Sequence, residues 1–302
     1  MNKLQANLCA SIEKSDFPVR LVAVYYQKNQ QLAEKIADLL PYPTIVVDGV
    51  RQGFTEKMRH DVSHAIELSH PAEPDYELCK WQRARLLSAD CLVLNLYDWQ
   101  ESYLADSFWG ITDYRELAGF LENIKHDLEK VSTFHITSDI GTDISFSVKK
   151  RRWIMANGLF RQDELSQMPD GEIYTCPIED TFEGVLMVDG TITRSWVPKE
   201  PQRLEFAAGK LVKASPDFAK YIRPLGPDIY LIGEFALGFN PAHKAIVHNI
   251  SVDEKAAGTI HFALGDSYQI GKNHCSCHVD MVIREPKIIT DPLISLPFFT
   301  KK

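Results

Sequence analysis

The order of apolar and amphipathic segments in the first 130 residues predicts strands that alternate with helices. Apolar runs rich in β-branched residues are typical of buried strands, and such runs cover 18–26, 43–49 and 89–98. Apolar residues at helical spacing predict helices over 27–40, 55–68, 76–89 and 113–130. This alternation favours a parallel sheet with helices on its faces. We therefore predict an α/β N-terminal domain over residues 1–130.

The pattern changes after residue 130, where short strand-like runs are separated by glycine, proline and aspartate. Segments such as DISFSVK, GVLMVDG and AIVHNIS are typical of short strands. Residues 216–221 are predicted to be helical, and little other helix is expected. The sequence thus predicts a mainly β (α+β) C-terminal domain over residues 131–302.

Residues 258–283 combine this strand pattern with side chains that bind metal ions. His278 and Asp280 stand two apart in a strand-like run, so both side chains point to the same face. His261 lies in an earlier strand-like run, and the turn between the two runs carries Tyr268. A hairpin brings His261 close to the pair, and two imidazoles with a carboxylate suit Zn, Mn, Co or Fe(II). The alternative is that the histidines are ordinary strand residues and that Asp280 caps a turn.

Composition and charge narrow the classes of function. The formal net charge of −8 and the pI of about 5.7 do not favour a surface that binds nucleic acid. No run approaches the ~20 apolar residues needed to cross a bilayer, and the N-terminus lacks the apolar core of a signal peptide. We therefore expect a cytoplasmic protein that does not bind membranes. No glycine-rich phosphate-binding loop follows a predicted strand, so neither a dinucleotide nor a nucleoside triphosphate is indicated.

The cysteines and the remaining histidines give weaker signals. The six cysteines are scattered with no CxxC pair, so neither a disulfide framework nor a zinc ribbon is predicted. His60 and His64 stand one turn apart on the predicted helix 55–68, with His70 nearby. Because no matching acid lies near them, we interpret all three as surface residues.

Several motifs in the second half resemble one known family. In order, they are GTDISF (141–146), PDGEIYTCPIED (169–180), GEFALGFNP (233–241), DEKAAGTIHFALGDSY (253–268) and HVDM (278–281). Their order and spacing resemble those of the thermophilic metallo-aminopeptidases, the aminopeptidase T and aminopeptidase S group. The resemblance covers about residues 131–285, and the first 130 residues show no convincing match.

The resemblance implies a dinuclear metal centre with a tyrosine alongside. The family motifs map its metal ligands onto Glu172, Glu234, His261, His278 and Asp280. Tyr268 and Glu172 are the residues that we expect to take part in catalysis, with Tyr268 donating a hydrogen bond to the oxyanion. Related enzymes are commonly homodimers, and the apolar stretches FALGF and PLISLPFF are candidate interface segments.

The predicted activity follows from that ligand set. Three carboxylates and two imidazoles can hold two divalent ions, Zn, Co or Mn, with a hydroxide between them. Such a metal-bridged hydroxide attacks a carbonyl, and a metal that binds a free α-amine confines cleavage to the N-terminal peptide bond. We therefore predict a metal-dependent aminopeptidase or related amide hydrolase, acting on a small peptide or peptide-like metabolite.

Two other functions remain open. The related dihydroxypyridine dioxygenases share these motifs and use one Fe(II), which Glu234, His278 and Asp280 would hold here. The third possibility is a non-catalytic binding subunit. Other acids, Glu254 beside Lys255 among them, are candidate bases or holders of a histidine, although exposed turn and salt-bridge roles are more common for such residues.

Overall fold

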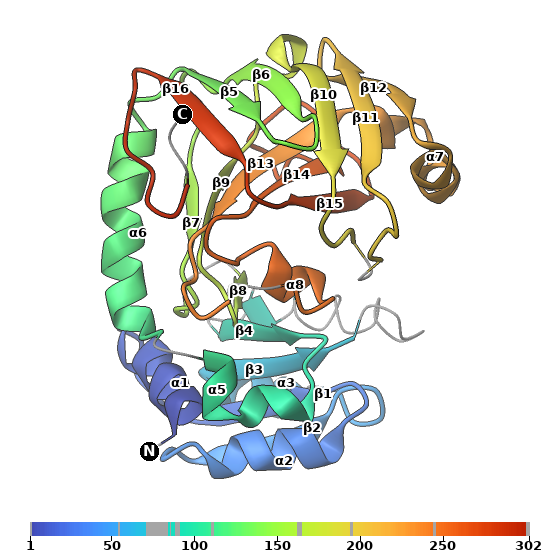
Figure 1. Ribbon diagram of the computed structural model, residues 1–302. Helices are drawn as coiled ribbons and strands as arrows, with labels where there is room; N and C mark the ends of the chain where they lie inside the picture. Colours follow the sequence, from blue (N-terminus) through green and yellow to red (C-terminus); the bar gives the residue numbers. More distant parts are fainter. Residues whose placement is uncertain are drawn as a thin grey trace. The chain divides into compact units, whose positions relative to one another are not determined.

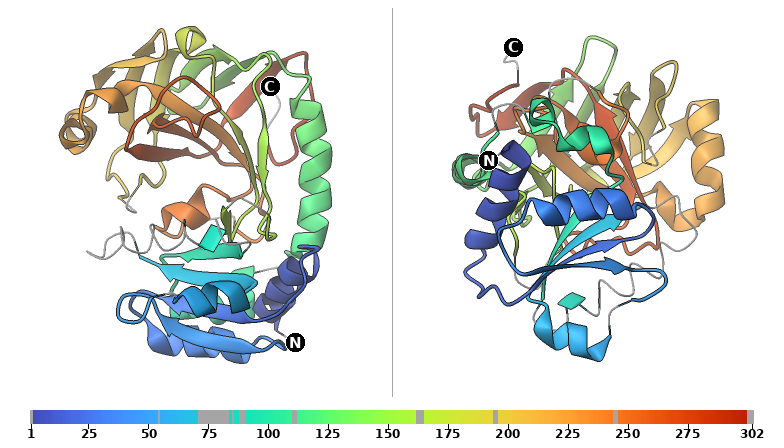
Figure 2. Two further views of the ribbon diagram at one scale, coloured as in Figure 1. Left: turned by 180° about the vertical axis from the view of Figure 1, so that it is seen from behind. Right: turned by 90° about the horizontal axis from the view of Figure 1, so that it is seen from below.

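The protein divides into two compact units in a computed structural model. The structure describes residues 2–53, 55–70, 84, 86–87, 91–109, 112–161, 165–193, 196–243 and 246–299. Unit 1 comprises Met1–Gly119 and Ala156–Asp170, and unit 2 comprises Phe120–Met155 and Gly171–Lys302 (Figure 1 and Figure 2). The predicted boundary near residue 130 falls inside unit 2, and the segment 156–170 belongs to unit 1.

Unit 1 contains a parallel sheet of five strands in the order β2-β1-β3-β4-β8. The strands are β1 (Val22–Tyr26), β2 (Thr44–Asp48), β3 (His64–Ser69), β4 (Leu92–Tyr97) and β8 (Leu165–Gln167). The helices that begin in unit 1 are α1 (Lys3–Glu13), α2 (Gln30–Asp38), α3 (Glu56–Asp61), η1 (Glu101–Leu104), α5 (Asp106–Trp109) and α6 (Tyr114–Leu128). The predicted α/β class is confirmed.

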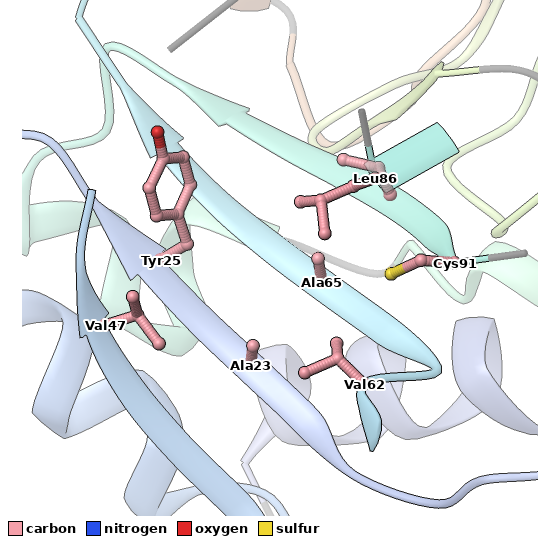
Figure 3. Packing of buried hydrophobic residues seen from close by; sticks show 8 residues of the cluster. Ala23, Tyr25, Val47, Val62, Ala65, Leu86 and Cys91 are labelled. Carbon is pink, nitrogen blue, oxygen red and sulfur yellow. The ribbon is translucent and has the colours of Figure 1, made fainter. Parts of the chain in front are cut away.

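Apolar side chains on the unit 1 sheet explain why these residues form strands and helices. Ala23 and Tyr25 stand two apart on β1, so both side chains point to the same face of the sheet. They pack in a cluster with Val47, Ala65 and Val93 of the other strands (Figure 3). Helix α2 buries Leu32, Ala33 and Ile36, which are spaced for a single helical face. Asn29 caps this helix, because its side chain accepts a hydrogen bond from the Leu32 backbone nitrogen.

The predicted helix over 55–68 is wrong in its second half. Helix α3 ends at Asp61, and HAIELS forms β3, whose six residues are all buried between β1 and β4. A strand that is covered on both faces has no polar side to its pattern, so periodicity did not distinguish it from a helix. Helix α1 was not predicted, and most of the predicted helix 76–89 lies outside the described residues.

Unit 2 contains two sheets built from antiparallel pairs, which confirms the predicted mainly β class. The first has the order β12-β11-β10-β6-β5-β16 and the second the order β15-β14-β13-β9-β7. The first sheet comprises β5 (Thr133–Thr137), β6 (Asp143–Ser147), β10 (Glu183–Val188), β11 (Gln202–Ala207), β12 (Lys210–Ala214) and β16 (Lys287–Asp291). The second comprises β7 (Ile154–Ala156), β9 (Glu172–Thr175), β13 (Ile232–Gly238), β14 (Ile260–Gly265) and β15 (His278–Ile283).

Short helices join the strands of unit 2. They are η2 (Glu179–Thr181), α7 (Pro216–Ile222), η3 (Arg223–Leu225), η4 (Pro227–Tyr230) and α8 (Ile250–Asp253). The predicted helix 216–221 corresponds to α7. None of the helices in the described part of the chain has the length and apolar character to span a membrane.

Aromatic side chains fill the core between the two sheets of unit 2. Phe235 on β13 packs against Phe134 and Phe146 of the first sheet, with ring centroids 4.9 Å apart in both pairs. Phe262 on β14 lies 5.1 Å from Phe235. Consecutive strand residues point to opposite faces, so Glu234 and His261 point away from this aromatic core. The FALGF stretch, predicted as an interface segment, is instead part of β13 and its buried end.

Candidate metal centre

The strand register places the predicted ligands on one face of the second sheet of unit 2. Glu234 pairs with Ala263 across β13 and β14, and Ala263 pairs with Asp280 across β14 and β15. Directly paired residues share a face in an antiparallel sheet, so Glu234 and Asp280 lie on either side of a small alanine. The alanine side chain leaves space between the two carboxylates.

The same register accounts for the other three ligand candidates. Ala236 of β13 pairs with His261, and Gly238 pairs with Glu172 of β9. His278 begins β15 two residues before Asp280, opposite Gly265. Four strands therefore carry the five predicted ligands on one face, and the residues between them are alanine or glycine.

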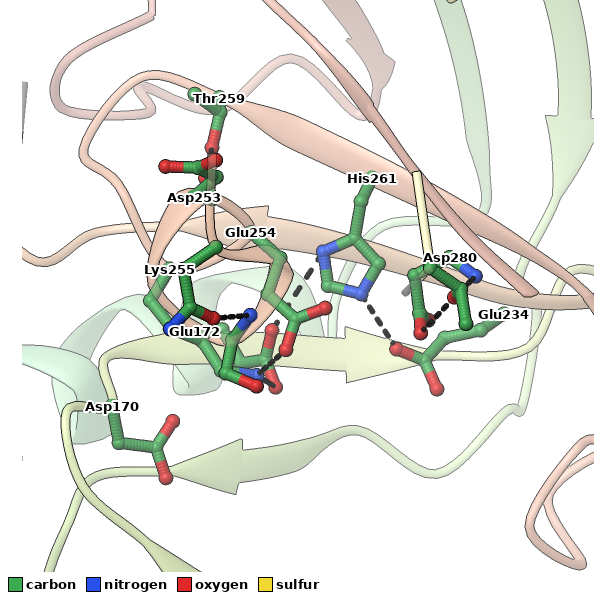
Figure 4. Close-up of polar contacts among 12 residues, drawn as sticks. Asp170, Glu172, Glu234, Asp253, Glu254, Lys255, Thr259, His261 and Asp280 are labelled. Atoms are coloured by element: carbon green, nitrogen blue, oxygen red, sulfur yellow. Dashed lines mark hydrogen bonds and ion pairs between the residues drawn. The ribbon is translucent and has the colours of Figure 1, made fainter. Parts of the chain in front are cut away.

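Glu234 lies at the centre of this group. Its Oε1 atom is 2.9 Å from Nε2 of His261, and its Oε2 atom is 3.6 Å from Nε2 of His278 (Figure 4). Nε2 of His278 is also 2.9 Å from Oδ1 of Asp280. One ligand atom from each of Glu234, His261 and Asp280 lies within 4.8 Å of the others. A carboxylate that faces two imidazoles in this way can bridge two sites or complete a single one.

Hydrogen bonds behind the ligands set their orientation. His278 Nδ1 bonds the backbone oxygen of Asp266 at 2.8 Å, which directs Nε2 into the cluster. Thr193 donates from Oγ1 to Asp280 Oδ2 at 3.1 Å and accepts from the Asp280 backbone nitrogen at 2.7 Å. Thr193 was not predicted as a site residue, because it lies 87 residues from Asp280 and belongs to no recognisable motif.

The carboxylates control the charge of both histidines. Burial lowers the pKa of His261, but the hydrogen bond to Glu234 and the charges of Glu172 and Glu254 outweigh it and raise that pKa to about 9. Burial likewise lowers the pKa of His278, and the charge and hydrogen bond of Asp280 raise it to about 10. Without a metal ion, both imidazoles therefore take up protons and act as the cations of the site.

Glu172 lies on the other side of His261. Its Oε2 atom is 3.7 Å from Nδ1 of His261, and its Oε1 atom forms an ion pair with Nζ of Lys255. Lys255 also pairs with Glu254 at 2.8 Å, and all three charged side chains are buried. The salt-bridge role expected for Glu254 is confirmed, but the residue is buried and not exposed.

Tyr268 lies on the rim of the cluster. It sits in the loop between β14 and β15 with a positive φ of 47°, and its ring centroid is 4.5 Å from that of His278. The residue is 48% exposed, so the ring covers His278 and still contacts solvent. Desolvation, with the charges of Asp280, Glu234 and Glu254, raises the pKa of Tyr268, which keeps its hydroxyl protonated as a hydrogen-bond donor.

The histidines of unit 1 do not form a metal pair. His60 is exposed, as expected, whereas His64 and His70 are buried. His64 lies in β3, and His70 bonds Asp98 at 3.2 Å. Among the described residues, no group of three potential ligands in unit 1 approaches within metal-binding range.

The chemistry of the cluster fits a divalent metal ion. Glu234, His261, His278 and Asp280 offer two nitrogen and at least two oxygen donors, the mixture that Zn, Mn, Co and Fe(II) accept. Nδ1 of His261 has no hydrogen-bond partner within reach in the described structure. Glu234 and His261 are buried, and His278 and Asp280 are partly buried. Ionisable groups removed from water in this way are costly unless their charges are compensated, and a divalent cation compensates the carboxylates.

Two solved structures share the fold of this chain. The structure of 2,5-dihydroxypyridine dioxygenase from Pseudomonas putida KT2440 is 16% identical, covers 99% of both chains and has a TM-score of 0.67. Wild-type AmpT from Thermus thermophilus is 14% identical, covers 97% of this chain and 95% of that one, and has a TM-score of 0.64. The similarity in fold therefore includes the first 130 residues, in which no sequence motif resembled the family.

Sequence comparison identifies the family more directly. No curated protein matches the chain. A family model, the thermophilic metalloprotease (M29) family, matches residues 103–291, which include every strand of the candidate metal centre. This match begins and ends outside the region 131–285 in which the motifs were recognised. The chain belongs to the thermophilic metalloprotease (M29) family.

Proposed function

We propose that this protein is a metal-dependent aminopeptidase or a closely related amide hydrolase. The observation that carries the proposal is the cluster of Glu234, His261, His278 and Asp280 on one sheet face, in a chain of a metalloprotease family. The expected substrate is a small peptide or a peptide-like metabolite.

The residues have distinct parts in this proposal. Glu234, His261, His278 and Asp280 hold the metal, which when bound supplies Lewis-acid polarisation of a carbonyl and a lower pKa for a bound water. Tyr268, with its protonated hydroxyl and partly exposed ring, is placed to donate a hydrogen bond to the carbonyl oxygen. The buried carboxylates attract a substrate with a free α-amine, which favours cleavage at the N-terminal residue.

The test combines metal analysis with turnover. Protein purified without chelator should contain Zn, Co or Mn and release an amino acid from aminoacyl-anilides or dipeptides. Glu234→Gln and His278→Ala should each lower kcat/KM by about 100-fold or more, because both remove a ligand. Glu205→Gln on β11, a partly exposed acid paired with Lys213, is the control that should retain activity. Unchanged turnover in either ligand variant would refute this site.

A second candidate is ring cleavage by one Fe(II). Two acids and one histidine can bind one Fe(II), and His278 lies between Glu234 at 3.6 Å and Asp280 at 2.9 Å. One solved structure of the same fold is a dioxygenase. One equivalent of iron with oxygen uptake on a dihydroxypyridine would favour this function. Absence of bound metal under any loading condition would favour the non-catalytic binding subunit.

A further inference from the structure

We infer that Glu172 is a positioning residue for His261 rather than a metal ligand, and that the buried ammonium of Lys255 stands where a second metal ion would bind. The site then takes one tightly bound divalent ion. This inference rests on the proposed metal site, and it departs from the two-ion centre and the ligand role of Glu172 that the sequence predicts.

The His261 ring separates Glu172 from the other ligands. Nε2 faces Glu234 Oε1 at 2.9 Å, whereas Nδ1 faces Glu172 Oε2 at 3.7 Å (Figure 4). The two ring nitrogens point away from each other, and a metal ion lies only about 2.0–2.1 Å from the nitrogen that binds it. An ion held by Nε2 therefore lies across the ring from Glu172.

The second oxygen of Glu172 is engaged by a cation of the protein itself. Lys255 Nζ pairs with Glu172 Oε1 and, at 2.8 Å, with Glu254 Oε1. Lys255 is 5% exposed, so water screens its charge poorly. A divalent ion bound to Glu172 would lie next to this ammonium, and like-charge repulsion would oppose it. Lys255 therefore compensates the carboxylates on this side of His261.

The remaining geometry matches a familiar way of holding a metal-binding histidine. A carboxylate placed against the imidazole nitrogen that does not bind metal fixes the ring orientation and raises the basicity of the ligand nitrogen. Glu172 lies on this side of His261, with Oε2 3.7 Å from Nδ1, a longer contact than the 2.8 Å hydrogen bond between His278 Nδ1 and the Asp266 backbone oxygen. In each histidine, Nε2 faces the ligand cluster and Nδ1 faces an oxygen atom on the other side of the ring.

The first test counts metal ions in the full-length protein. After loading with Zn or Mn and removal of free metal, elemental analysis should find one equivalent in the wild type. Glu172→Gln should retain one equivalent with an affinity lowered by about 10- to 100-fold, as expected for a residue that orients a ligand. Asp280→Asn should lose the ion. Two equivalents in the wild type, with one of them lost in Glu172→Gln, would overturn the inference while leaving the hydrolase proposal intact.

The second test removes the ammonium. Lys255→Met keeps much of the side-chain volume and leaves Glu172 and Glu254 without their cation, so the metal content should rise toward two equivalents. Magnetic coupling between Mn(II) ions in the EPR spectrum should then appear in this variant and be absent from the wild type. Lys255→Arg should restore one equivalent. Lys213→Met removes an exposed lysine that pairs with Glu205, and its metal content should match that of the wild type.

The first test remains decisive if Lys255→Met fails to fold, because Glu172→Gln retains the lysine and reports on the same question. Coupled Mn(II) ions in the wild type would contradict the inference. A wild-type protein that binds no metal at all would instead contradict the proposed function.

Discussion

Histidines buried in this chain are cationic or neutral depending on the groups around them. His261 and His278 lie among carboxylates, which raise their pKa values to about 9 and 10. His64 and His243 are buried without a carboxylate among the causes of their shifts, and desolvation lowers both pKa values to about 4. The residue type alone therefore does not determine whether a histidine is a cation, a ligand or a neutral core residue.

His64 makes the stability of unit 1 depend on pH. Its two ring nitrogens bond the hydroxyls of Ser15 at 3.1 Å and Ser63 at 3.0 Å, and its pKa is about 4 instead of 6.5. The unfolded chain protonates His64 more readily than the folded protein does. The free energy of unfolding is therefore highest above pH 6.5 and falls as the pH decreases toward 4. We expect a loss of about 2 kcal/mol between pH 7 and pH 5.

Denaturant unfolding at the two pH values measures this effect. His64→Gln keeps a polar side chain that does not titrate, so the stability difference between pH 7 and pH 5 should shrink by about 2 kcal/mol relative to the wild type. An equal pH dependence in the two proteins would show that His64 does not carry it.

Strand register decides which side chains can act together in unit 2. The alternation along β13 and β14 sends Phe235 and Phe262 into the core and Glu234 and His261 to the other face. Small residues on the ligand face, Ala263 among them, keep the space between the carboxylates open. The metal centre is thus a property of four adjacent strands: β13, β14 and β15 supply the donors, and β9 supplies Glu172 beside His261.

Ala263→Leu tests the need for that space. The larger side chain would project between Glu234 and Asp280, so metal binding should be lost, with a stability cost of about 1–3 kcal/mol from overpacking. Titration calorimetry with Zn measures the binding. Ala65→Leu, at a buried alanine of β3 in unit 1, is a matched control that should lose stability and still bind the ion. Normal metal affinity in Ala263→Leu would argue against the cluster as the binding site.

At the scale of the whole molecule, the metal centre belongs to one of the two units. All its ligand residues lie in unit 2, as do Lys255, Thr193 and Tyr268. An ion that binds only the folded form stabilises it by mass action, by about 2.7 kcal/mol at a free concentration 100 times its dissociation constant. Bound metal should therefore stabilise unit 2 more than unit 1.

Removal of metal should consequently lower the thermal stability of unit 2 selectively. In calorimetric scans with chelator and with excess Zn, the transition of unit 2 should shift by several degrees, and readdition of Zn should restore it. Tryptophans of unit 1, Trp99 and Trp109, are buried and can report its unfolding separately in variants that lack the other tryptophans. Equal shifts in both units would contradict a site confined to unit 2.

The homodimer expected from the resemblance stays a prediction. Of the stretches proposed for an interface, FALGF is buried in β13, whereas PLISLPFF exposes Leu293 by 74% and Phe298 by 53%. Light scattering on the purified protein would give the oligomeric state.

Local patterns in the sequence determined the element types and the ligand candidates. Period-two alternation and an i, i+2 pair suffice to predict that His278 and Asp280 share a face, and the hairpin with His261 follows from the turn between two strand-like runs. The two-unit α/β and β class was predictable for the same reason, because each element carries its own apolar pattern. The failure at β3 shows the limit, since a strand buried on both faces has no pattern of its own.

Tertiary structure alone decided how the candidates divide between the two sides of His261. Glu172 and Lys255 are 83 residues apart, and Thr193 and Asp280 are 87 apart, so no local period relates them. Their contacts depend on which strands are neighbours and in which register, which the packing of the two sheets sets. The sequence therefore determined which residue types were present for a metal site, and the fold determined which of them face the ion and which face a lysine.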